Sequence, residues 1–206
     1  MAALIAAAKA PDFPAEIVLV ISNKERAPGL EIAAQEGIAT LAISHRKYVD
    51  RASFDLAMTV QMEAAGVEIV CLAGFMRLLS PEFCRQWEGR LINVHPALLP
   101  AFKGLDTHAR ALAAGVKMHG ATVHFVTPEM DEGPIIAQAA VPVLDGDSES
   151  DLAARVLAQE HIIYPLALKL VASGSIDIRD GRTWCTSAVA APGALIAPAI
   201  IMGGAS

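Results

Sequence analysis

The chain has 206 residues, of which 54% are hydrophobic and 18% are charged, and its formal net charge is −6 at pH 7. This composition excludes an intrinsically disordered chain, and the acidic balance argues against a nucleic-acid-binding groove. The three cysteines are widely spaced and form no pair of the kind that binds zinc or cycles as a disulfide. We therefore expect reduced thiols and a cytoplasmic protein with one domain and a tail.

The end of the chain is apolar, but its sequence is broken by helix-disrupting residues. No charged residue follows Arg182, while Pro192, Gly193 and Pro198 interrupt the segment. These interruptions argue against a membrane-spanning helix. We therefore expect a folded domain over residues 1–185, an apolar tail over 186–206 and no membrane partner.

The predicted elements alternate along the first half of the chain. Short apolar runs and longer amphipathic segments follow one another, which is typical of a parallel sheet covered by helices on both faces. The expected helices are 1–9, 29–36, 50–65 and 81–87, and the expected strands are 16–22, 38–43, 67–73 and 90–95.

The second half predicts a different arrangement. A helix at 106–114 precedes two strand-like runs, 119–127 and 133–144, which a turn-rich segment separates, so we expect them to pair as an antiparallel hairpin. Ser148 and Asp151 form a capping-box pattern, which predicts a helix that runs to about Ala172. The predicted fold class is therefore α/β: a Rossmann-like, doubly wound, mostly parallel sheet with an antiparallel hairpin in the C-terminal half.

Asn93 and His95 are the first candidate site residues. They are two apart in the expected strand 90–95 and so project to the same face. Pro96 ends this strand and leaves both side chains at its carboxyl end, where open α/β sheets bind ligands. The alternative interpretation makes His95 a hydrogen-bonded core histidine and Asn93 a turn former.

Three charged residues are further candidates. Asp131 lies in the turn between the two strand-like runs, where an aspartate usually caps the backbone. Glu160 belongs to the apolar stripe of the last helix, so it is either a partnered residue at the edge of the stripe or an acceptor for a ligand hydroxyl or amine. Arg77 follows a buried strand and either lines the same sheet edge or caps a short helical turn.

The histidine spacing argues against a metal site. His119 and His124 are five apart in a strand-like run and so face opposite sides, and Glu160 and His161 form no HExxH motif. We expect no metal.

Four segments together resemble the phosphoribosylglycinamide formyltransferase family, the folate-dependent glycinamide ribonucleotide transformylases of purine synthesis. These segments are AGFMRLLSP (73–81), INVHPALLPAFKG (92–104), HGATVHFVTPEMDEGPIIAQ (119–138) and ARVLAQEHIIYP (154–165). The resemblance runs from Met1 to about Trp184. It implies formyl transfer from 10-formyltetrahydrofolate, as cosubstrate, to the amine of glycinamide ribonucleotide, without a metal or a covalent enzyme intermediate.

The resemblance also implies residue roles. Asn93 and His95 would donate hydrogen bonds to the oxyanion, His95 would protonate the departing folate nitrogen, and Asp131 would keep His95 protonated. The implied folate contacts are Arg51, Met76, Arg77, Leu78, Leu79, Asn93, Thr127, Pro128, Glu129, Met130 and Asp131. The implied nucleotide contacts are Leu157, Ala158, Gln159 and Glu160, with Glu160 on the ribose or the amine.

The sequence departs from the family pattern at two places. Asp106 stands where the family form has His, so no role is carried over to that position. The family opens with a strand and a Gly-Ser-Asn loop that binds the substrate phosphate, whereas this sequence begins within the following helix. We expect about a dozen further residues before Met1 in the natural enzyme. Without that central strand, its neighbours would lose backbone hydrogen bonds and expose apolar faces.

Three other functions compete with this interpretation. A formyltetrahydrofolate hydrolase would use the same Asn, His and Asp with water as acceptor, but that family normally adds an N-terminal regulatory domain. A methionyl-tRNA formyltransferase would need a C-terminal tRNA-binding domain and a more basic surface. A truncated, non-catalytic folate-binding module is the alternative from another class. The expected partners are small-molecule substrates and no nucleic acid, in a monomer or homodimer.

Overall fold

The computed structural model describes residues 1–186 and 197, and its first half alternates helices and strands as the sequence predicts. The elements are α1 (Ala2–Ala8), β1 (Leu19–Ser22), α2 (Pro28–Gln35), β2 (Ala39–Ala42), the 3-10 helix η1 (His45–Lys47), α3 (Arg51–Ala64), β3 (Val70–Leu72), α4 (Pro81–Gln86) and β4 (Leu91–His95). Asp50 caps α3 by accepting the backbone N–H of Ser53 at 2.8 Å. Residues 187–196 and 198–206, which hold most of the expected tail, lie outside the described part.

The second half contains the predicted hairpin and one that the sequence analysis missed. Its elements are α5 (Thr107–Ala113), β5 (Met118–Phe125), β6 (Ile135–Pro142), α6 (Glu149–Ala172), β7 (Ile176–Arg179) and β8 (Arg182–Cys185). Strands β5 and β6 pair antiparallel, as predicted, and so do β7 and β8. Asp180 and Gly181 form the turn of the missed hairpin, both with positive φ, and this Asp-Gly pair is a strong hairpin signal.

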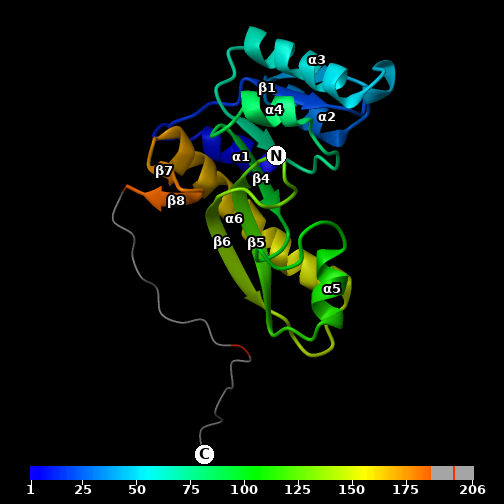
Figure 1. Ribbon diagram of the computed structural model, residues 1–206, viewed down its shortest axis with the longest axis vertical. Coiled ribbons are helices and arrows are strands. Elements are labelled where there is room, and N and C mark those ends of the chain that lie inside the picture. The colour runs from blue at the N-terminus through cyan, green and yellow to red at the C-terminus, as the bar shows by residue number, and fades with distance from the viewer. Residues whose placement is uncertain (187–196, 198–206) are drawn as a thin grey trace, which may run out of the picture.

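The strands form a mixed sheet and two separate pairs (Figure 1). The four-stranded sheet has the order β3-β4-β5-β6, in which β3 and β4 are parallel and the other neighbours are antiparallel. Strands β1 and β2 form a parallel pair of their own. The α/β class is therefore confirmed, with the parallel pairs in the first half of the chain and the antiparallel pairs in the second.

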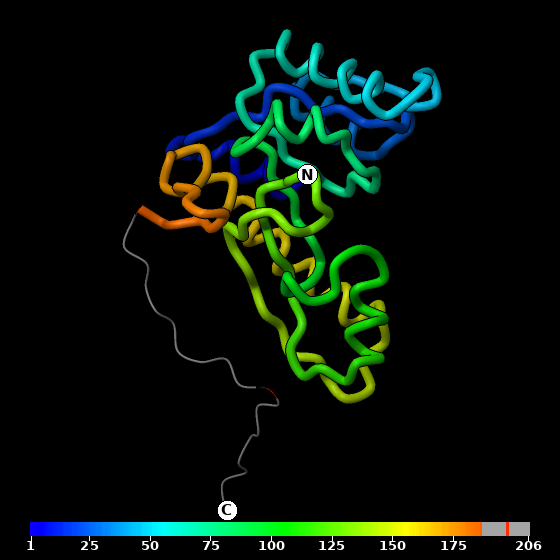
Figure 2. Tube along the Cα trace, in the orientation of Figure 1, coloured from blue at the N-terminus to red at the C-terminus, as the bar shows by residue number. Residues whose placement is uncertain are grey.

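Helix α6 is the longest helix, and it packs against β5 and β6 (Figures 1 and 2). Its predicted capping box is present, since Ser148 accepts the Asp151 N–H and the Asp151 carboxylate accepts the Ser148 N–H. The predicted apolar stripe is buried: Leu152, Val156, Ile163 and Ala167. None of the helices in the described part of the chain is long and apolar enough to cross a membrane.

The hydroxyl of Tyr164 connects α6 to two strands of the sheet. It lies 2.8 Å from the carbonyl oxygen of Leu72 in β3 and 3.1 Å from that of Ile92 in β4. A hydroxyl has one hydrogen, so it donates to one carbonyl at a time. The Tyr164 hydroxyl therefore connects α6 to both β3 and β4.

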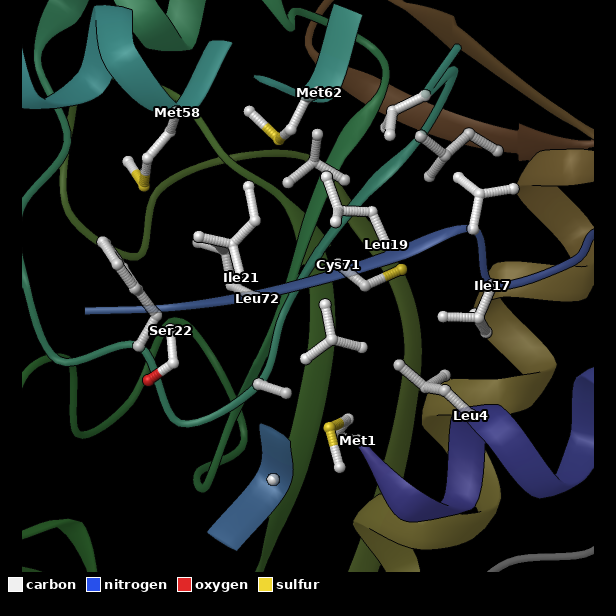
Figure 3. A pocket seen from close by; sticks show the side chains of 18 of the residues that line it. Met1, Leu4, Ile17, Leu19, Ile21, Ser22, Met58, Met62, Cys71 and Leu72 are labelled. Atoms are coloured by element: carbon white, nitrogen blue, oxygen red, sulfur yellow. The ribbon is translucent and has the colours of Figure 1, made fainter. Parts of the chain in front are cut away.

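Strands β1 and β3 each have one neighbour among the described residues: β1 pairs with β2, and β3 with β4. Each therefore leaves one backbone edge without a strand partner. A cavity of about 890 Å³ lies between these edges, and Figure 3 shows Leu19 and Ile21 of β1 beside Cys71 and Leu72 of β3. The apolar side chains on both strands are half-buried.

Candidate active site

The register of β4 and β5 brings polar side chains together at one face of the sheet. Asn93 lies opposite His124, and His95 lies opposite Thr122. Because alternate residues of a strand share a face, these four side chains belong to one surface. The side-chain nitrogen Nδ2 of Asn93 is 3.4 Å from Nε2 of His124. His124, which the sequence analysis considered only as a metal ligand, thus joins the site.

The turn after β5 adds Asp131, as the resemblance implies. Its Oδ2 lies 3.5 Å from Nδ1 of His95, and its Oδ1 lies 3.9 Å from Nε2 of His124. Asp131 has a left-handed backbone, with φ of 56°, and its Oδ2 accepts the backbone N–H of Gly104 at 2.8 Å. An amide and two imidazoles from β4 and β5 and a carboxylate from the turn after β5 therefore converge.

The loop that follows β4 fixes the His95 ring. Nε2 of His95 donates to the carbonyl oxygen of Phe102 at 3.0 Å. The Thr122 hydroxyl supports the loop from β5 by donating to the Ala97 carbonyl at 2.7 Å and accepting the Leu99 N–H at 3.0 Å. With Nε2 held by Phe102, the other ring nitrogen, Nδ1, faces the Asp131 carboxylate.

His124 positions the Asn93 amide. Burial lowers the pKa of His124, while its hydrogen bond to the Phe125 carbonyl and the negative charge of Asp131 oppose that shift. We assign the proton of the neutral ring to Nδ1, because Nδ1 lies 2.8 Å from the Phe125 carbonyl oxygen. Nε2 is then an acceptor for the Asn93 side chain, which keeps one further N–H for a ligand.

The implied folate contacts lie on two surfaces. Met76 and Leu78 are exposed and Leu79 is half-buried in the segment after β3. In the turn 127–131, Thr127 donates to the Glu129 carbonyl at 3.2 Å, and Met130 and Pro128 are exposed. Exposed apolar side chains in both segments leave surface for a flat aromatic ligand.

The charges of Arg51 and Arg77 act on a buried carboxylate, Asp55, that the sequence analysis missed. Asp55 in α3 is 2% exposed and accepts the Ser80 N–H at 2.6 Å. Burial raises the pKa of Asp55, while the Ser80 hydrogen bond and the charges of Arg51 and Arg77 oppose the shift. The guanidinium of Arg77 also lies 5.8 Å from the centre of the Phe54 ring. The sequence signal for this carboxylate was a charged residue on the buried face of α3.

The implied nucleotide contacts lie on α6. Leu157 and Ala158 are exposed, and Gln159 and Glu160 are half-buried. Burial raises the pKa of Glu160, and the amino terminus of Met1 acts in the opposite direction. Among the described residues, Glu160 has no ion pair within 4.0 Å and no side-chain hydrogen bond. Its carboxylate is therefore available to a ligand.

Asp106 shows no contact that would give it a role in the site. It is exposed and precedes α5 with a left-handed backbone, without a side-chain capping bond. Within residues 1–186 and 197, no group of three or more His, Cys, Asp or Glu side chains is placed to hold a metal ion. The large cavity between β1 and β3 is not lined by Asn93, His95 or Asp131.

A sequence profile for the family described as Formyl transferase matches residues 1–168. The chain belongs to the formyl transferase family. This formyl transferase is 45% identical over 182 residues to the phosphoribosylglycinamide formyltransferase of Escherichia coli, which covers 88% of the chain and 86% of that relative. The resemblance inferred from the four motifs is thus confirmed.

Two further comparisons extend this result. The structure of glycinamide ribonucleotide transformylase 1 from Symbiobacterium toebii superimposes with a TM-score of 0.86 at 45% identity, over 89% of this chain and 86% of that one. The trifunctional purine biosynthetic protein adenosine-3 of Gallus gallus is 49% identical over 183 residues, or 89% of this chain. The chain spans only 18% of the length of that relative.

Proposed function

We propose that this formyl transferase moves the formyl group of 10-formyltetrahydrofolate to the primary amine of glycinamide ribonucleotide. The observation that carries the proposal is the convergence of Asn93, His95 and Asp131, with His95 Nδ1 at 3.5 Å from the carboxylate. The names of the Escherichia coli and Symbiobacterium toebii relatives support the choice of substrates.

The proposed chemistry needs no covalent bond to the protein. The amine nitrogen attacks the formyl carbon, and the carbonyl electrons move to the oxygen to give a tetrahedral oxyanion. The Asn93 N–H and the protonated His95 ring stabilise this charge. The bond between the formyl carbon and the folate nitrogen then breaks, and that nitrogen takes a proton from His95. The attacking amine gives its proton to water, and His95 takes up a proton from water, which restores the charged ring.

We propose that the mobile proton of His95 is the one on Nδ1. Nε2 is held by the Phe102 carbonyl, whereas Nδ1 faces Asp131 and the turn 127–133. A carboxylate beside this nitrogen stabilises the charged ring before the transfer. After the transfer, the hydrogen bond from Nε2 to the Phe102 carbonyl keeps the ring oriented. We therefore propose Asp131 as the residue that keeps His95 ready as a proton donor.

Binding of the two substrates is proposed on opposite sides of this centre. The folate lies against Arg51, the segment from Met76 to Leu79 and the turn from Thr127 to Asp131, whose exposed apolar side chains suit a pterin. The nucleotide lies along 157–160, where the free carboxylate of Glu160 accepts a hydrogen bond from the ribose or the amine. We propose that the reaction takes place in the cytoplasm, without nucleic acid or membrane, in a monomer or homodimer.

The test is a product assay with both substrates. Mass spectrometry should detect formylated nucleotide and tetrahydrofolate in equal amounts, and neither when the nucleotide is omitted. Release of formate at the same rate without nucleotide would instead identify a hydrolase. Binding of folate in calorimetry with no turnover of either kind would identify a binding module and contradict the proposal.

A further inference from the structure

The loop from Ala101 to Asp106 contacts both members of the proposed proton-donor pair. The Phe102 carbonyl accepts a hydrogen bond from Nε2 of His95 at 3.0 Å. The Gly104 N–H donates to Oδ2 of Asp131 at 2.8 Å. One short loop therefore holds both the imidazole and the carboxylate, whose nearest nitrogen and oxygen lie 3.5 Å apart.

The backbone of this loop adopts a conformation that its side chains do not favour. Phe102 and Asp106 have positive φ values of 54° and 55°, and Gly104 between them has a φ of 80°. A left-handed backbone is uncommon for residues with a Cβ atom, and for a bulky residue such as phenylalanine it is an outlier. Such a conformation persists only where the surrounding structure holds it. The loop therefore needs contacts from outside itself.

The side chain of Arg110, in the last turn of α5, supplies such contacts. Its Nη1 donates to the Lys103 carbonyl at 2.6 Å and to the Leu105 carbonyl at 3.2 Å. Its guanidinium carbon lies 5.7 Å from the centre of the Phe102 ring. Helical side chains tilt toward the amino end of their helix, and the loop lies at that end of α5. One guanidinium therefore contacts the three residues that surround Gly104.

The hydrogen bonds of Arg110 go to the loop and not to a carboxylate. Among the described residues, no carboxylate oxygen lies within 4.0 Å of its guanidinium. A basic residue in the last turn of a helix can bind the free carbonyls at that end, but the carbonyls bound here precede α5. Hydrogen bonds from a charged donor are stronger than those between neutral groups.

A second contact of the loop is weaker. The Lys103 ammonium pairs with the Glu132 carboxylate at 2.9 Å, and the two side chains are 35% and 54% exposed. Ion pairs that are open to solvent contribute little to holding a geometry. The side chain of Lys103 is also not needed by Arg110, which binds the backbone carbonyl of this residue.

We propose that Arg110 is a positioning residue for formyl transfer, which holds the loop 101–106 so that the His95 imidazole and the Asp131 carboxylate keep their mutual geometry. Arg110 acts through the backbone of the loop and not on the reacting atoms. Without its hydrogen bonds, the loop leaves its left-handed conformation more often, and fewer molecules have the proton donor aligned. This inference rests on the proposed function of His95 and Asp131.

Steady-state kinetics of Arg110→Ala tests the positioning role. We expect kcat to fall about tenfold or more, because a small misplacement of a catalytic group is costly, while KM for the folate changes less than about twofold. The melting temperature should stay within about 3 °C of that of the unmodified protein, because the side chain is exposed. An unchanged kcat, or an equal loss of kcat and folate affinity, would overturn the inference.

Two further variants separate the hydrogen bonds from the charge. Lys103→Ala removes a positive charge from the same loop but leaves the carbonyl that Arg110 binds, so its turnover should match that of the unmodified protein. Arg110→Lys keeps the charge but lacks the planar guanidinium, so it should recover less than about half of the lost turnover. An equal loss in Lys103→Ala, or full recovery in Arg110→Lys, would assign the effect to charge and overturn the inference.

Hydrogen exchange without substrates tests the loop independently of the activity. The Gly104 amide, which donates to Asp131, should exchange at least about tenfold faster in Arg110→Ala. The Leu99 amide, which donates to the Thr122 hydroxyl, is the internal reference and should not change. If the unmodified protein transfers no formyl group, the proposed function fails while this exchange still tests the loop. Unchanged exchange at Gly104, or an equal increase at Leu99, would overturn the inference.

Discussion

Strands β4 and β1 have similar apolar sequences but very different burial. Leu91 and Ile92 in β4 have no exposed surface, whereas Leu19 and Ile21 in β1 are half-exposed. The difference follows from their neighbours, because β4 lies between β3 and β5, while β1 has β2 on one side and the cavity on the other. Burial of a strand therefore depends on the elements at both its edges, and the candidate active site is built on the enclosed strands.

The largest expected effect is a loss of turnover when the candidate active site is altered. We expect His95→Ala or Asp131→Asn to lower the turnover of formyl transfer by about 10²–10⁴-fold, since each removes part of the transition-state stabilisation. Folate affinity should change much less, because these groups act mainly in the transition state. Steady-state kinetics and folate titration measure the two effects.

His161→Ala is the control for these variants, because His161 lies on the exposed side of α6. Its turnover should match that of the unmodified protein. An equal loss of turnover and folate affinity in His95→Ala would indicate a structural role for His95 instead.

The different burial of β4 and β1 predicts that a leucine-to-alanine substitution lowers the free energy of unfolding more in β4 than in β1. Leu91→Ala should lower the free energy of unfolding by about 3–5 kcal/mol, because it empties a fully buried site. Leu19→Ala should cost only about 1 kcal/mol, since its side chain is already half-exposed beside the cavity. Urea denaturation measures both, and equal costs would contradict the difference in packing.

Acidification should lower the free energy of unfolding, because His119 in β5 is buried and resists protonation in the folded protein. Its side chain is 1% exposed, and burial together with the nearby His108 lowers its pKa to about 4. The unfolded chain therefore binds more protons between about pH 6.5 and pH 4, so stability falls as pH decreases through that window.

Denaturation at two pH values measures this effect. His119→Gln should reduce the stability lost between about pH 7 and pH 5 by about 2 kcal/mol. The exposed His161→Gln is the matched control and should leave the loss unchanged. A parallel loss in the His119 variant and the control would assign the acid sensitivity to other groups, such as His108 and His124, whose pKa values burial also lowers.

A further small effect is expected where Tyr164 contacts β3 and β4. Tyr164→Phe removes the hydroxyl that reaches the Leu72 and Ile92 carbonyls, and it should cost about 1–2 kcal/mol of unfolding free energy. Hydrogen exchange should increase more in β3 than in β4, because β4 keeps a partner strand on each side. A uniform increase in both strands would mean that Tyr164 does not hold β3 in place.

Most helices and strands were predictable from the sequence, because they depend on residues that lie close together in the chain. The Ser148 capping box, the β5–β6 hairpin and the apolar stripe of α6 depend on residues close together in the chain, and all three are present. The β7–β8 hairpin was missed although its Asp-Gly turn was visible. The separation of β1 from the four-stranded sheet depends on which strands become neighbours, and periodicity carries no such information.

The site was predictable only in part for the same reason. Asn93 and His95 were recognisable because they share a face of one strand, and Asp131 was assigned to them by the resemblance rather than by spacing. The role of His124 depends on the antiparallel register that places it opposite Asn93. Asp55 accepts the Ser80 N–H because α3 packs beside the start of α4. Such tertiary neighbours follow from packing and not from local pattern.

The left-handed backbone of Asp131 restricts which residues can replace it. At a φ of 56°, glycine, asparagine and aspartate are readily accommodated, whereas β-branched side chains are strained. Glutamate would keep the charge but place it one methylene farther from the backbone. Asparagine alone keeps both the length and the conformation while it removes the charge, so substitution at this one position separates electrostatics from shape.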